Sequence, residues 1–300
     1  MSPIRCTLPL PRSYRHADVL AFHGRDALST AESVQGPSIR KGIMWRACPT
    51  VVEVVLDGDQ AHCTWWVDGA PEGASEEVLQ ELAKRLLGLQ MDTEAFEAAH
   101  GAHPELGALI TAQSGLRVPM AATPFEALIW AVTGQQINVG VASQLRRRLI
   151  LLAGQPHASG LWCHPDAEGI ARLSEASLRE VRFSVAKTNT ILAISRLVAE
   201  GRLPLDDWMV APLPVSDIEA ALLTIKGVGP WTVNYTLLRG FGHADGSLHG
   251  DVAVRNALQR MLLGTDKVSS LLAEAWLKQF APWRSLVAAH LWASLRFAEG

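Results

Sequence analysis

The pattern of apolar and polar positions changes near residue 92. Before it, the β-branched run 51–56 is followed by a turn signal at 57–59 and a second run at 62–67, which predicts a β-hairpin. Apolar residues then recur at helical spacing over 75–88, and the closing glycine suits a helix C-terminus. We predict a small antiparallel α/β domain over residues 1–92, with the sheet backed by one or two helices.

Beyond residue 92 the spacing is almost purely helical, so we predict a helical domain over 93–300. Thr123-Pro124-Phe125-Glu126 combines a capping threonine, a proline at the first helical position and a glutamate that completes a capping box. Ser216-Asp217-Ile218-Glu219 repeats the capping-box pattern, with serine as the cap. The fold class predicted is α+β, with a mostly α-helical body. Further helices are expected over 141–149, 254–261, 271–280 and 286–297, and loops over 154–165 and 203–214.

Composition and charge restrict the class of protein. Of 300 residues, 48% are apolar and 19% charged, a balance that excludes wholesale disorder. No apolar run is long enough for a transmembrane helix, and residues 1–11 lack the apolar core of a secretory signal. The net charge of −3 excludes a generally basic nucleic-acid coat but not a local DNA site.

The four cysteines Cys6, Cys48, Cys63 and Cys163 are far apart and form no C-x-x-C pair. This spacing provides no framework for zinc or an iron–sulfur cluster and is typical of reduced thiols in a cytoplasmic protein. Ten tryptophans against two tyrosines supply large surfaces for stacking on a base or a cation.

The most informative segment runs from residue 222 to 236. An apolar helix leads into Lys226-Gly227-Val228-Gly229, and Pro230 opens the next helix. The two glycines leave backbone N–H groups at a helix N-terminus uncovered, which suits a phosphate oxygen. The alternative is an ordinary corner between two helices.

The motifs that follow this hairpin resemble the helix–hairpin–helix DNA glycosylase superfamily. A glycine-containing loop at 240–242 leads to Asp251 at the start of another helix, and the similarity is greatest to the DNA-3-methyladenine glycosylase II branch, which repairs alkylated DNA. Nearly the whole chain is covered. The other matching segments are 14–22 with the following hairpin, 115–119, 125–126, 134–136, 282–285 and 290–292.

The resemblance places Asp251 at the family's catalytic carboxylate. Helix N–H groups and the helix dipole favour an ionised carboxylate at this position. Cleavage of an N-glycosidic bond builds positive charge on the sugar, which a fixed anion stabilises, and the anion can also orient water. The alternative is that Asp251 only caps its helix.

The resemblance also implies a pocket for a flipped base, walled by Trp231, Tyr235 and Trp292, with Phe22 near the same cleft. Electron-rich rings attract a cationic alkylated purine. The alternative, that some of these rings are core residues, is strongest for Phe22. Two residues depart from the family: Val252 stands where an aromatic is familiar, and Ala293 follows Trp292. Both favour a roomier pocket and leave base preference open.

Further DNA contacts are implied by position. Gln136 matches the side chain that wedges into the duplex, although the familiar residue there is apolar; the alternative is a solvent-facing glutamine. Lys226 is expected to contact phosphate or solvent, together with Gly227, Val228 and Gly229 of the hairpin. The basic run at 146–148 reads as a solvated helix face or a phosphate contact.

Two absences refine the reaction expected. Bifunctional members carry a lysine where this chain has Trp231, so a Schiff-base lyase is disfavoured. The iron–sulfur subgroup has four cysteines after the catalytic aspartate, and here none follows Asp251. We expect no cofactor and no metal in the chemistry, although hairpin carbonyls of the family hold a monovalent cation.

The sequence therefore predicts a monofunctional glycosylase that excises 3-methyladenine and related N-alkylpurines from double-stranded DNA. Two alternatives stay open: a glycosylase for uracil, deaminated or oxidised bases, and a non-enzymatic DNA-binding module. Asp251 disfavours the second, because a pure binder has no use for an anion beside phosphates. We expect a cytoplasmic, nucleoid-associated monomer without membrane contact.

Overall fold

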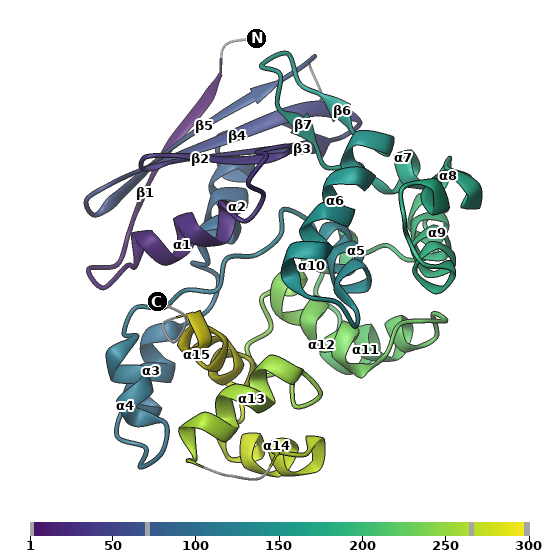
Figure 1. The fold of residues 1–300 in the computed structure, drawn as a ribbon. Coiled ribbons are helices and arrows are strands. Elements are labelled where there is room, and N and C mark those ends of the chain that lie inside the picture. The colour runs from purple at the N-terminus through teal and green to yellow at the C-terminus, as the bar shows by residue number, and fades with distance from the viewer. Residues whose placement is uncertain (1–2, 70–72, 264–266, 297–300) are drawn as a thin grey trace.

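The chain begins with a five-stranded antiparallel sheet, as a computed structural model shows for residues 3–69, 73–263 and 267–296 (Figure 1). The strand order is β1-β5-β4-β3-β2. The predicted hairpin is confirmed as β4 and β5, with Asp57 paired to Gln60 across the turn. The strands are β1 (Ile4–Pro9), β2 (Glu32–Gln35), β3 (Ser38–Trp45), β4 (Cys48–Asp57) and β5 (Gln60–Val67).

Helices α1 (His16–His23) and α2 (Glu76–Leu87) lie on the face of this sheet that is turned toward the rest of the molecule (Figure 1). The predicted start and end of α2 are confirmed. Ser75 Oγ accepts a hydrogen bond from the Val78 N–H, and Gly88 ends the helix with a φ of 70°. Because this φ is left-handed, a glycine suits the position.

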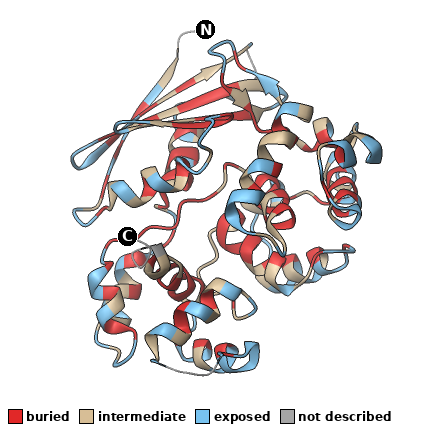
Figure 2. Ribbon diagram, in the orientation of Figure 1, coloured by how far each residue is buried: buried red, intermediate tan, exposed pale blue. Residues whose placement is uncertain are grey.

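The helical body has two lobes, each with its own apolar core (Figures 1 and 2). The α+β fold class predicted from the sequence is confirmed. The first lobe contains α5 (Pro124–Gly134), α6 (Val139–Ala153), α7 (Ala167–Ala171), α8 (Glu175–Glu180), α9 (Val185–Ala199), α10 (Asp207–Val210) and α11 (Val215–Leu223). The second contains α3 (Thr93–His100), α4 (Gly107–Ala112), α13 (Val252–Met261), α14 (Ser270–Leu277), the 3₁₀ turn η2 (Lys278–Phe280) and α15 (Arg284–Arg296).

Helix α12 (Pro230–Thr236) and the π-helical turn η1 (Leu237–Phe241) join the two lobes. Val233 belongs to the core of the first lobe and Tyr235 to the core of the second, so opposite faces of one short helix are buried in different lobes. Residues carried by α12 therefore lie where the lobes meet.

Most predicted helices are present, with three corrections. The capping box at Ser216 is wrong: α11 begins at Val215 after Pro214, and the Ser216 hydroxyl bonds Asp217 instead. The predicted loop 154–165 contains a two-stranded ribbon, β6 (Gln155–Pro156) and β7 (Trp162–Cys163). The predicted loop 203–214 contains α10. The last residue of the predicted C-terminal helix, Phe297, lies outside the described residues.

The β6–β7 ribbon fastens the first lobe to the sheet. His164 N–H donates to the Gly42 carbonyl and Trp162 N–H to the Thr30 carbonyl. A Cβ on Gly42 would stand 2.1 Å from the Trp162 carbonyl oxygen, so only glycine permits this approach. No helix within the described ranges is long and apolar enough to cross a membrane.

Candidate active site

Asp251 lies at the N-terminus of α13, as the sequence predicted. Its Oδ1 accepts a hydrogen bond from the Val254 N–H at 3.0 Å, the contact of an N-capping residue. The side chain is half-buried, and Val252 beside it is 60% exposed. The carboxylate thus combines a fixed position with access from outside.

Two tryptophans hold the same carboxylate. The Trp231 indole N–H donates to Asp251 Oδ2 at 2.8 Å, and the Trp292 indole N–H donates to Oδ1 at 3.1 Å. An ionised carboxylate has about four acceptor sites. With the Val254 N–H, three are occupied, which leaves one on Oδ2 for a substrate or a water molecule.

Tyr235 joins these rings into one aromatic cluster. Its ring centroid lies 5.3 Å from that of Trp231 and 6.2 Å from that of Trp292. The phenolic oxygen accepts a hydrogen bond from the Trp130 indole N–H at 2.8 Å. An indole N–H can only donate, so the Tyr235 hydroxyl proton is not used in this bond.

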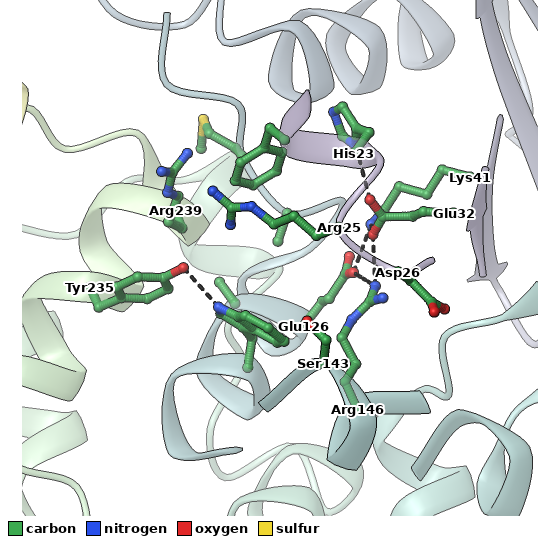
Figure 3. Close-up of a pocket in the computed structure, with 15 residues that line it drawn as sticks. His23, Arg25, Asp26, Glu32, Lys41, Glu126, Ser143, Arg146, Tyr235 and Arg239 are labelled. Carbon is green, nitrogen blue, oxygen red and sulfur yellow. Dashed lines mark hydrogen bonds and ion pairs between the residues drawn. The ribbon is translucent and has the colours of Figure 1, made fainter. Parts of the chain in front are cut away.

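A cleft opens beside this cluster, between the sheet domain and the helical body. Tyr235 and Trp130 line it, whereas Asp251, Trp231 and Trp292 are not part of its wall. Figure 3 shows Tyr235 and Arg239 on one side of the cleft, with the Arg25 side chain extending toward them.

Phe22 also lines the cleft, and its ring contacts two guanidinium groups. The Arg25 and Arg239 Cζ atoms lie 4.2 Å and 4.7 Å from its ring centroid. Arg239 is also 5.9 Å from the Trp292 ring, so it connects Phe22 to the Asp251 cluster. Contacts of this kind are attractive because the ring face is negative.

The inner wall of the cleft is a buried ion cluster (Figure 3). Lys41 Nζ lies 2.5 Å from Glu32 and 2.7 Å from Glu126, and Arg146 reaches both carboxylates at 2.7 Å. Burial alone would raise the pKa of each carboxyl group, but Lys41 and Arg146 outweigh it, so both pKa values lie well below the usual range. Burial lowers the pKa of the neighbouring His164 to about 4, which leaves that imidazole neutral.

This cluster corrects two predictions. Arg146 is not on a solvated face: its side chain is 13% exposed and links β2 to α5. The capping box at Thr123 is half right. Thr123 Oγ1 does accept from the Glu126 N–H, but the Glu126 carboxylate bonds the Ala122 N–H rather than closing the box.

The hairpin joins α11 to α12 as predicted. Lys226 and Gly227 are exposed, whereas Val228 is 7% exposed and packs into the first lobe. Gly227 has a φ of 91°, and a Cβ there would lie 2.1 Å from Thr190 Oγ1. A Cβ on Gly229 would meet no atom within 4 Å, so the approach to the α12 N-terminus is open.

Gln136 is exposed at the apex of the turn between α5 and α6, with a left-handed φ of 56°. Its neighbour Gln135, which the sequence did not single out, reaches the hairpin. Gln135 Nε2 donates to the Gly227 carbonyl and to Thr232 Oγ1, both at 2.9 Å.

The structure thus brings together Asp251, Trp231, Tyr235 and Trp292, with Phe22 connected through Arg239. Gln136 and the hairpin form a second group beside it. Ala293 does not widen the pocket, because it is 1% exposed in the core. Trp130 and Gln135 were missed, since each lies in a segment already explained by helical spacing or by its neighbour. Among the described residues, no group of three or more His, Cys, Asp or Glu side chains is placed to hold a metal ion.

Comparisons with known proteins show what the chain is similar to. The chain is 30% identical to the DNA-3-methyladenine glycosylase of Bacillus subtilis over 77% of this chain and 78% of that protein. It is 26% identical to DNA-3-methyladenine glycosylase 2 of Escherichia coli over 95% of this chain and 96% of the relative. The solved 3-methyladenine DNA-glycosylase of Archaeoglobus fulgidus shares the fold with a TM-score of 0.81 at 20% identity, over 97% of this chain and 98% of that one.

Two family models match consecutive parts of the chain. The AlkA N-terminal domain matches residues 5–123, which include the five-stranded sheet except for Ile4. The second model matches residues 129–282, which include the hairpin and Asp251. Since the second match alone spans half of the chain, the chain belongs to the HhH-GPD superfamily of base excision DNA repair proteins.

Proposed function

We propose that this protein is a monofunctional DNA glycosylase that excises alkylated bases, chiefly 3-methyladenine and related N-alkylpurines, from double-stranded DNA. The observation that carries the proposal is the Asp251 carboxylate, held at the N-terminus of α13 by the indoles of Trp231 and Trp292. The names of the Bacillus subtilis and Escherichia coli relatives support the choice of alkylated purines.

Asp251 acts on the sugar in this mechanism. As the C1′–N bond of the flipped nucleotide lengthens, positive charge develops on the sugar ring, and the fixed anion stabilises it. The remaining acceptor site on Oδ2 can face C1′ or orient a water molecule toward it. The base leaves with its bonding electron pair, and the water supplies the hydroxyl at C1′ while its second proton passes to Asp251 or to solvent.

The aromatic cluster binds the leaving base. An alkylated purine such as 3-methyladenine already carries positive charge, so it departs without a strong general acid. Trp231, Tyr235 and Trp292 offer π-faces to this cation, and the attraction is about 2 kcal/mol at a desolvated site. The same faces give less to a neutral, undamaged base.

The second group of residues holds the DNA. The backbone of Gly227 to Gly229 contacts phosphate without reading sequence, Lys226 adds a nearby positive charge, and Gln136 enters the duplex at the flipped nucleotide. A glutamine can hydrogen-bond the base left unpaired. We propose that the protein acts as a monomer, without a cofactor in the chemistry; a monovalent cation on hairpin carbonyls stays a prediction.

The test is a panel of duplexes that each carry one modified base: an N-alkylpurine, uracil, hypoxanthine or 8-oxoguanine. We expect abasic sites to form fastest in the N-alkylpurine duplex. Faster release of uracil or 8-oxoguanine would establish the alternative base specificity. Tight binding of all duplexes without release would establish a DNA-binding module.

A further inference from the structure

We infer that Gln135 is a positioning residue for base flipping: it fixes Gln136 at a set distance from the hairpin that holds the phosphate. The inference rests on the proposed function, because it takes Gln136 as the side chain that enters the duplex. Gln135 itself faces the protein and would touch neither the base nor the sugar.

The contacts of Gln135 join three elements. Its backbone ends α5, and its side-chain N–H groups donate to the Gly227 carbonyl of the hairpin and to the Thr232 hydroxyl oxygen of α12. A backbone carbonyl can only accept, which fixes the Gln135 amide with its nitrogen toward the hairpin. Thr232 is 2% exposed and follows Trp231, so the same amide also reaches the helix that carries the aromatic cluster.

Gln136 needs such support. A non-glycine residue at a φ of 56° is held in an unfavourable conformation, and it persists where surrounding contacts fix it. On one side of Gln136 is the Gln135 amide. On the other, Asn138 caps α6 by accepting from the Val141 N–H at 2.9 Å. The exposed side chain at the apex is therefore carried by a turn fixed at both ends.

Helix α9 forms a second link between the end of α5, which leads into the turn that carries Gln136, and the hairpin. Lys187 Nζ donates to the Thr133 carbonyl at the end of α5, at 2.7 Å. Thr190, one helical turn on, donates from Oγ1 to the Lys226 carbonyl of the hairpin at 3.0 Å. The turn that carries Gln136 and the hairpin are thus joined twice, and Gln135 is the direct connection.

The consequence concerns geometry on DNA. A phosphate on the hairpin and the gap left by the flipped base are separated by a distance that the duplex sets. If the Gln135 link is lost, a smaller fraction of the bound protein has the hairpin on its phosphate and Gln136 in the gap at the same time. The rate at which a paired base is flipped should then fall. Phosphate binding by the hairpin and catalysis by Asp251 should be unaffected, because neither uses Gln135.

The experiment compares Gln135→Ala with the unmodified protein on two substrates. One duplex carries 7-methylguanine paired with cytosine; the other carries it unpaired in a one-base bulge, where extrusion costs least. Loss of two hydrogen bonds should slow single-turnover release from the paired site by about tenfold or more. Release from the bulge should change by less than about threefold, because an unpaired base needs little help to leave the stack. Equal losses on both substrates would overturn the inference, because they indicate a general structural defect.

A double-mutant comparison identifies the residue through which Gln135 acts. In a Gln136→Ala background the Gln135→Ala change should have little further effect on the paired site. An undiminished effect there would overturn the inference. Gln80→Ala is the matched control, since Gln80 also donates an amide hydrogen bond, to Glu76 on α2, away from the site. If the unmodified protein releases 7-methylguanine from neither duplex, the proposed function fails. If the unmodified protein and Gln135→Ala release it from both duplexes at the same rates, only this inference fails.

Discussion

Replacement of Asp251 by asparagine separates catalysis from helix capping. The asparagine carbonyl can keep the hydrogen bonds from the Val254 N–H and the Trp292 indole, because both use Oδ1. Its NH₂ group then takes the place of Oδ2 and faces the Trp231 indole N–H, which bonded Oδ2 at 2.8 Å. Two donors would meet, so we expect a loss of about 1–3 kcal/mol in the free energy of unfolding.

The effect on catalysis should be larger and of a different kind. Removal of the anion takes away its electrostatic stabilisation of the sugar cation, worth about 3 kcal/mol or more. At about 1.4 kcal/mol for each tenfold change, release should slow by roughly two orders of magnitude or more. Binding to abasic-site DNA should persist or improve, since an anion near phosphates repels them in the ground state.

The assay is single-turnover release of 3-methyladenine from methylated DNA, together with a melting curve of each protein. Asp166→Asn is the matched control: Asp166 caps α7, in the first lobe, by accepting from the Gly169 N–H at 2.8 Å. Asparagine caps as well as aspartate, so this variant should melt and react like the unmodified protein. A folded Asp251→Asn protein that releases base at nearly the normal rate would refute the catalytic role.

Three further outcomes follow from the site and its surroundings. Borohydride should not trap a covalent protein–DNA adduct, because Trp231 stands where bifunctional members have lysine; efficient trapping would contradict a monofunctional mechanism. Gly229→Val should weaken binding to all duplexes alike, because the new side chain would cover backbone that contacts phosphate. The variant should still fold, since a Cβ at Gly229 meets no atom within 4 Å and the φ of −112° suits any residue, whereas a side chain at Gly227 would also distort the hairpin. A loss of binding confined to damaged DNA would place the hairpin in the base pocket. The free energy of unfolding should fall as pH drops from about 6 to about 3, because the Glu126 carboxyl has a depressed pKa in the folded protein and its ordinary pKa in the unfolded chain, so protons bind the unfolded chain more tightly. In urea titrations, Lys41→Met should make stability depend less on pH and should cost about 3 kcal/mol at neutral pH. An unchanged pH dependence in this variant would count against the ion cluster.

Local signals predicted the elements that position the site. Thr123, Pro124 and Glu126 fix the start of α5 through contacts within four residues, and Asp251 does the same for α13. Contacts between residues so close in the sequence can be predicted from the local sequence alone. The failure at Ser216 has a local cause too: Pro214 lies two residues earlier, its φ of −51° already suits a helix, and α11 begins directly after it.

The missed features depend on contacts between distant segments. Glu32 and Arg146 are 114 positions apart, and the helical spacing of Arg146 was equally compatible with a solvated face. Trp130 was not singled out, because the partner of its indole N–H is 105 positions away on α12. Hydrogen bonds of this kind leave no periodic pattern, so neither the cleft wall nor the Gln135 link could be derived from spacing alone.

The tryptophans of the site show why charge and stacking surface are coupled here. Phenylalanine supplies a ring without a donor, whereas an indole supplies a large ring and one N–H. Trp231 and Trp292 each use that N–H on Asp251, so the rings that we propose to stack on the base and the carboxylate form one hydrogen-bonded unit. In the proposed mechanism, a base that tilts either ring also moves the anion relative to C1′. A poorly fitting base is then penalised twice, once in binding and once in the stabilisation of the sugar cation. Discrimination against undamaged bases can therefore exceed what stacking energies alone would provide.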